Sequence, residues 1–169
     1  EEASLFDINA GVHYNDYSKA ALLLNLTSRN LGIPNGRLAL DLVLGSVSRI
    51  TAEYVVDRGF SPGFGVNFNA FNQYGYNYNQ GKRIFSYDIG VARSAGYGLM
   101  TFRNVMRLRM GYELEENNIS QDVSIIDFDN LSNLSINLFA DFTVDTYDQF
   151  TFPNEGFYFY GKWTIGAGE

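Results

Sequence analysis

The residues of this chain that first suggest catalysis are Gly59-Phe60-Ser61-Pro62-Gly63, which match the pattern G-x-S-x-G literally. In hydrolases this pattern places a nucleophilic serine on a sharp turn between a strand and a helix, close to a base. Here the residues after the motif alternate like another strand, and Pro62 removes a backbone N–H next to the serine, where an oxyanion donor usually lies. We therefore interpret the motif as a turn in which Pro and Gly separate two strands.

Metal chemistry has few candidate ligands. His13 is the sole histidine and the chain has no cysteine, so neither a His-rich nor a thiolate site is expected. The acidic groups at 113–116 and from Asp122 to Asp129 offer oxygen ligands for calcium, but their spacing does not match the twelve-residue calcium loop. We interpret His13 as a polar lumen residue and the acids as a solvated loop. We assign no catalytic, cofactor-binding or metal-binding residue.

Arg107 and Arg109 place two cations two residues apart, on one face of a predicted strand. Cations that are enclosed need carboxylate partners on neighbouring strands. We predict a cross-strand ladder of ion pairs. The alternative is a constriction of a lumen, where the cations would tune permeability.

Alternation of apolar and polar residues predicts the elements that position these groups. In residues 105–115, Met106, Leu108 and Met110 alternate with Arg107 and Arg109. Side chains of a strand point alternately to opposite faces, and helical spacing fits none of the segments. The predicted strands lie at 5–14, 18–27, 37–45, 49–57, 64–70, 85–91, 105–115, 134–145 and 157–165. The sequence therefore predicts an all-β fold, an antiparallel up-and-down meander of about 8–10 strands forming at least part of a barrel, with 1–169 as one domain.

The connections are expected to alternate between the two ends of this meander. Short turns after the first and third strands share one end with two longer polar loops, at 73–82 and 116–132. The opposite end receives the connections at 29–36, 58–62, 94–102 and 152–156.

Composition excludes several classes of protein. The net charge of −7 argues against a nucleic-acid partner, because phosphate binding needs a basic patch. No stretch approaches the ~18 consecutive apolar residues of a membrane helix. The first residues, Glu-Glu-Ala-Ser, lack the features of a secretion signal, so we expect that a signal has been removed or that the chain is an internal piece.

The polar face favours a membrane barrel over a soluble one. It combines charges of both signs with small residues, which suits a wet barrel interior better than a solvent-exposed face. The charged residues assigned to it are Asp41, Glu53, Asp88, Arg107, Arg109 and Asp141, and the glycines are Gly11, Gly65, Gly90 and Gly111. Predicted strands of about 10 residues also match tilted membrane strands. We expect a lipid bilayer as partner. The alternative is a soluble barrel that binds an apolar ligand.

Six aromatic residues are candidates for girdles at the membrane interface or, alternatively, for loop packing. They are Tyr74, Tyr76, Tyr78, Tyr158, Tyr160 and Trp163.

Two segments carry a resemblance to a known family. Residues 12–31 resemble the first hairpin of the barrel domain of the bacterial surface antigen superfamily, closest to the barrel that follows the catalytic domain of outer-membrane patatin-like phospholipases. The second segment runs from Asp145 through Gly156 and ends in Phe152-Pro153-Asn154-Glu155-Gly156, which is similar to the family's periplasmic turn F-P-x-x-G. The resemblance implies a barrel in the bacterial outer membrane that anchors or exports a lipid-hydrolysing domain, with 73–82 and 116–132 outside the cell.

The chain departs from that family in two respects. Such a barrel has about sixteen strands and needs roughly 300 residues, so this chain would cover only about the first half. The phospholipase elements are absent, so any lipase activity would lie in an upstream domain and the chain itself is expected not to be an enzyme. A half barrel has open edges, which favour a homodimer, closure on itself or aggregation. The expected function is an anchor or translocation scaffold, and the alternative is a passive pore.

Overall fold

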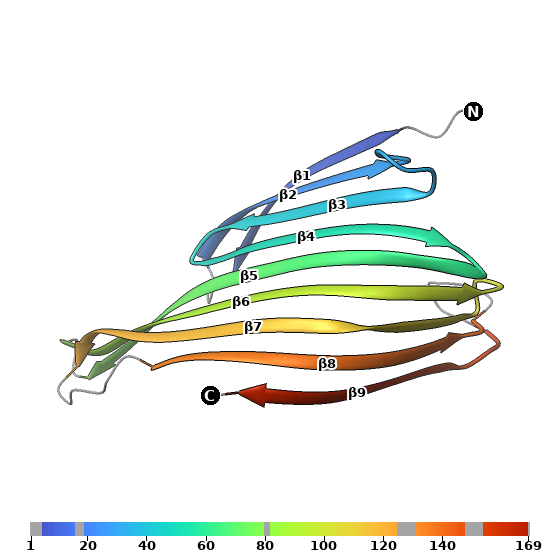
Figure 1. Ribbon diagram of the computed structural model, residues 1–169. Helices are drawn as coiled ribbons and strands as arrows, with labels where there is room; N and C mark the ends of the chain where they lie inside the picture. Colours follow the sequence, from blue (N-terminus) through green and yellow to red (C-terminus); the bar gives the residue numbers. More distant parts are fainter. Residues whose placement is uncertain (1–4, 16–18, 80–81, 125–130, 148–153, 169) are drawn as a thin grey trace.

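The computed structural model describes residues 5–15, 19–79, 82–124, 131–147 and 154–168, and these form one antiparallel sheet (Figure 1). Each strand pairs with the next in chain order, so the predicted all-β meander is confirmed. The nine strands are β1 (Phe6–Asn15), β2 (Lys19–Arg29), β3 (Gly36–Leu44), β4 (Val47–Arg58), β5 (Ser61–Asn79), β6 (Lys82–Phe102), β7 (Met106–Ser124), β8 (Leu131–Asp145) and β9 (Tyr158–Gly168). Within the described residues β1 and β9 do not pair, so the sheet is open like a partial barrel.

No helix among the described residues has the length and hydrophobicity needed to cross a membrane.

Three strands are much longer than predicted. Residues 73–79 belong to β5, 94–102 to β6 and 116–124 to β7, so the loop predictions are wrong over these residues. Their Gly and Asn residues suggested loops, but pairing with β6 keeps 73–79 and 116–124 in the ladder, and β6 itself pairs with β5 and β7 over 94–99. Gly75, for example, lies so close to the ring of Tyr87 that a Cβ there would overlap it. In a barrel strand a glycine of this kind accommodates an aromatic neighbour and does not mark a turn.

The two ends of the meander differ as predicted. The connections β1–β2, β3–β4, β5–β6 and β7–β8 share one end, and Figure 1 shows β5, β6 and β7 extending there well beyond β1–β4. At the opposite end β6 turns into β7 at 103–105, where Arg103 and Asn104 adopt positive φ angles of 52° and 58°. Over 73–79 and 116–124 the long end is therefore a continuation of the sheet and not loop, whereas 80–81 and 125–130 lie outside the described residues.

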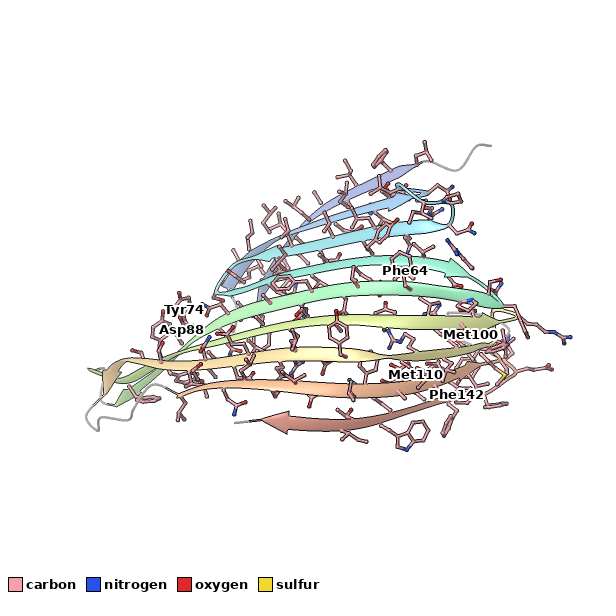
Figure 2. The ribbon with its side chains drawn as sticks, in the orientation of Figure 1. Phe64, Tyr74, Asp88, Met100, Met110 and Phe142 are labelled. Carbon is pink, nitrogen blue, oxygen red and sulfur yellow. The ribbon has the colours of Figure 1, made fainter. Side chains whose placement is uncertain are left out.

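The strand registers join the alternating residues into two continuous faces. One row, for instance, runs from Phe68 through Ser94 and Leu114 to Ile136. We call the side that carries this row the apolar face and the other side the polar face. Figure 2 labels six residues that the registers place on the apolar face: Phe64, Tyr74, Asp88, Met100, Met110 and Phe142.

The prediction that Asp88 and Gly90 of β6 lie on the polar face is wrong. The register of β6 pairs Tyr74 with Asp88 and Asn72 with Gly90, so Asp88 and Gly90 lie on the apolar face and not on the polar one. The larger apolar residues of this part of β6, such as Val91, therefore lie on the polar face. Alternation shows that the residues of a strand form two sets on opposite faces, but not which set lies on which face. On the apolar face β6 carries small residues, whereas the neighbouring strands carry large ones. The small residues are Gly90, Ala92, Ser94, Gly96 and Gly98.

The buried core lies on the polar face, whereas the apolar face is open. Ala95, Tyr97, Leu99 and Phe139 form the buried cluster. On the apolar face large side chains are exposed across the whole sheet. Examples of their exposed fractions are 74% for Ile8, 64% for Leu138 and 78% for Ile165. A soluble fold would cover such a face, because exposed apolar patches of this extent mark an interaction surface.

Candidate functional site on the concave polar face

Two hydrogen bonds on the polar face join side chains of β4 and β6, which are not neighbouring strands in the sheet. The hydroxyl of Tyr97 on β6 donates to Oε1 of Glu53 on β4 at 3.1 Å, and the hydroxyl of Thr101 donates to Asp57 at 2.8 Å. β5 lies between these strands, and Gly65 is the β5 residue opposite Tyr97. Because Gly65 has no side chain, the ring of Tyr97 lies across it. Contacts between alternate strands require the sheet to curl towards this side, so the polar face is concave.

Arg109 and Asp141 form the most buried ion pair on this face. They are register partners on β7 and β8, and Nε and Nη2 of Arg109 donate to the two carboxylate oxygens at 2.9 Å each. Only 1% of the Asp141 side chain is exposed. The guanidinium carbon of Arg109 also lies 5.2 Å from the centre of the Tyr97 ring, a favourable cation–π position. The ion-pair ladder predicted for Arg109 is confirmed.

These contacts join into one chain of charges across the sheet. Arg37 on β3 approaches Glu53 with 3.1 Å between Nη2 and Oε2, and Glu53 accepts from Tyr97. We call Arg37, Glu53, Tyr97, Arg109 and Asp141 the polar network. It contains two cations and two carboxylates, so its formal charge is balanced without outside ions. Such pairing is what makes buried charge tolerable.

Two further ion pairs flank the network towards the long end. Nε of Arg93 lies 2.6 Å from Glu115, its register partner. Nζ of Lys162 on β9 lies 3.5 Å from Oε2 of Glu113 on β7. The same nitrogen lies 5.1 Å from the centre of the Phe139 ring. These acids therefore belong to a strand and not to the solvated loop that we predicted.

No group of three or more His, Cys, Asp or Glu suited to a metal ion occurs among the described residues. Of the second acidic group, Asp122 lies in β7, and 125–130 lie outside the described residues.

Arg107 does not follow the ladder prediction. It is exposed near the end of β7, and within the described part of the chain it makes no ion pair. It lines a polar hollow of about 310 Å³ together with Asp57, Thr101, Thr143 and Asp145. The hollow presents a cation among oxygen acceptors, an arrangement suited to water and small ions. The lumen-constriction alternative therefore stays open for Arg107.

A ladder of amides on β1–β3 was not anticipated. Asn9 donates to Asn25 at 3.3 Å, and Asn25 donates to Asp41 at 2.6 Å. Each of these residues belongs to the polar set of its predicted strand, and this shared face was the sequence signal that could have indicated the ladder. His13 also lies on the polar face, as predicted.

The remaining motifs have structural roles. Gly59 adopts a positive φ of 65° and the turn between β4 and β5 is confined to 59–60, whereas Ser61, Pro62 and Gly63 already belong to β5. The motif is thus confirmed as a strand-to-strand connection, but its last three residues are strand and not turn. Tyr158 and Tyr160 lie on the polar face, so they are not part of an outward girdle. Tyr74, Tyr76 and Trp163 lie on the apolar face, and the side chain of Tyr78 lies outside the described residues.

Comparisons with known proteins agree with this geometry. A search of curated proteins finds no match to the chain. The sequence model of the OMP85 superfamily matches residues 1–166, nearly the whole chain. This agrees with the resemblance to bacterial surface antigens, while the closer similarity to patatin-like phospholipases stays a prediction. An open antiparallel meander with one apolar and one concave polar face, matched over 1–166, identifies the chain as a member of the OMP85 superfamily.

Proposed function

We propose that this chain forms nine consecutive strands in the wall of an outer-membrane β-barrel and that this barrel has a transport or insertion role. Members of the OMP85 superfamily are outer-membrane proteins, and we place this chain in the bacterial outer membrane on that basis. The observation that carries the proposal is the contrast between the faces. The apolar face exposes large hydrophobic side chains, whereas the concave face pairs its charges internally. Lipid outside and water inside a barrel call for this arrangement.

The finer part of the proposal is that the barrel anchors, or serves as translocation scaffold for, a phospholipase-type domain. Its support is the similarity of residues 12–31 to the first barrel hairpin of outer-membrane patatin-like phospholipases. In this proposal the chain itself is not an enzyme and the lipase activity belongs to a separate domain. The test is fatty-acid release from phosphatidylcholine vesicles by the complete protein. A complete protein with neither this activity nor a globular domain before the barrel would refute this part.

The open edges support a proposal about pairing. Unpaired edge strands readily add further strands. We therefore propose that β1 and β9 pair with more strands of the complete protein or with a second copy in a homodimer. Light scattering of the complete protein in detergent distinguishes these cases, since a homodimer doubles the protein mass. A monomer that retains an open edge would contradict both.

Conductance across planar bilayers distinguishes a scaffold from a passive pore. For a scaffold we expect the complete protein to insert and show no steady open state, because the polar network and its flanking ion pairs lie across the concave face and pair its charges with one another. A steady conductance with anion preference that Arg107→Glu reverses would instead establish a pore constricted at Arg107. A protein that stays soluble and monomeric without detergent would refute both.

A further inference from the structure

The lengths of β5, β6 and β7 raise the question of where they leave the bilayer. They contain 19, 21 and 19 residues, whereas β3 contains 9. A tilted strand crosses the hydrocarbon with about 10 residues. Roughly half of each long strand must therefore lie outside the hydrocarbon if the proposed membrane function holds.

The polarity of the apolar face changes along these strands. Near the short end it carries Phe64, Val66 and Phe68 on β5, opposite the small residues of β6. Between 64 and 70 on β5, 92 and 100 on β6, and 108 and 114 on β7, no residue of this face is charged. Beyond this band the same face carries Asn72, Asp88, Glu116, Asn118 and Ser120.

These polar residues bond to one another. Asn72 donates to Asp88 at 3.3 Å, and Asn118 donates to Glu116 at 3.0 Å. Figure 2 shows Tyr74 and Asp88 close together towards the long end, away from Phe64 and Met110. A carboxylate facing hydrocarbon is costly, so Asp88 and Glu116 mark a part of the face that meets water or lipid headgroups.

The opposite face of the sheet does not show the same division. On the short-end side of this level it carries polar Asn69 but also buried Tyr97 and Leu99, and beyond it buried Val91 is the register partner of Asn117. In the proposed function this face lines the barrel interior, so lipid does not contact it on either side of the line. The position of the line therefore rests on the apolar face.

We propose that the bilayer surface crosses the sheet between Ala70 and Asn72 on β5, between Ala92 and Gly90 on β6, and between Leu114 and Glu116 on β7. The hydrocarbon contacts the apolar face on the short-end side of this line. The parts of β5–β7 beyond it stand outside the hydrocarbon as a projecting ribbon with a polar outer surface. This inference rests on the proposed membrane function.

Single cysteines test the line, because the chain has no cysteine of its own. Two pairs match strand, face and exposure: Val66→Cys with Tyr74→Cys on β5, and Met110→Cys with Asn118→Cys on β7. The complete protein, with any cysteine outside this chain replaced by serine, is placed in phosphatidylcholine nanodiscs, which leave both ends open to water. Each variant is then treated with a charged maleimide before and after detergent is added. Circular dichroism confirms that each variant retains its strands.

We expect Tyr74→Cys and Asn118→Cys to label in the nanodisc, and Val66→Cys and Met110→Cys to lose labelling until detergent is added, because thiols in hydrocarbon do not ionise. Protection of all four positions would overturn the line while leaving the membrane function intact. Protection of only Tyr74→Cys and Asn118→Cys would place the bilayer on the other half of the strands and overturn it too. Labelling of all four would refute both the line and the membrane function.

Discussion

The polar side chains of the concave face interact differently on β1–β3 and on β4–β8. On β1–β3 the amides of Asn9 and Asn25 pass hydrogen bonds to the next strand, and Asn9 and Asp41 at the ends of this ladder are exposed. On β4–β8 the contacts reach across strands, and Tyr97 and Asp141 are buried. Glycine placement explains one of these contacts, because the ring of Tyr97 lies across β5 at Gly65, which has no side chain. Among the described residues, a fully buried carboxylate is found on this half of the sheet, at Asp141.

The largest expected effect is on the buried ion pair. Asp141→Ala leaves the Arg109 guanidinium without its carboxylate, and we expect a loss of about 3 kcal/mol in the free energy of unfolding. Urea unfolding of the protein in detergent micelles, followed by circular dichroism, measures it. The matched control is Asp41→Ala, whose carboxylate is exposed in the amide ladder, and for which we expect a loss of less than about 1 kcal/mol. Equal losses for the two variants would contradict the difference between the halves.

Glycine placement gives the second effect. A Cβ at position 65 would overlap the ring of Tyr97, so Gly65→Ala should displace the ring and cost about 1–3 kcal/mol of unfolding free energy. Gly11→Ala is the control, because a Cβ there meets no atom within 4 Å and should change stability by less than about 0.5 kcal/mol. The same urea experiment compares them. If both alanines were equally tolerated, Gly65 would not be what allows the crossing.

Tyr97→Phe removes only the hydroxyl that donates to Glu53 and keeps the ring in place. We expect a loss of about 1.5 kcal/mol, the usual contribution of a hydrogen bond to a charged acceptor. In the Gly65→Ala background the same substitution should cost less, because the displaced ring no longer reaches Glu53. A double-mutant cycle measures this coupling, and additive losses would show that the two residues act separately.

The smallest effect is expected in the amide ladder. Asn25→Ala removes two accessible hydrogen bonds that water can replace, so we expect a change within about 0.5 kcal/mol. A loss comparable with that of Asp141→Ala in urea unfolding would mean that β1–β3 depend on polar contacts as strongly as β4–β8 do.

The sequence predicts the strands better than it predicts their contacts. Alternation is a property of one strand, so it located all nine strands and the common end of their turns. The phase between strands depends on register, and for that reason Asp88 was assigned to the wrong face. The need of Arg109 for a carboxylate was predictable from burial, but its partner was not. The contact of Tyr97 with Glu53 depends on Gly65 lying between them, and only the folded sheet brings these three residues together.

Trp163 gives the most direct test of whether the apolar face contacts lipid. It is the only tryptophan of this chain, it lies on the apolar face of β9, and it is 63% exposed. With Trp163 as the sole tryptophan of the complete protein in vesicles, we predict strong quenching of its fluorescence by lipids brominated on their acyl chains and little quenching by aqueous iodide. Strong quenching by iodide together with none by the brominated lipids would contradict the account.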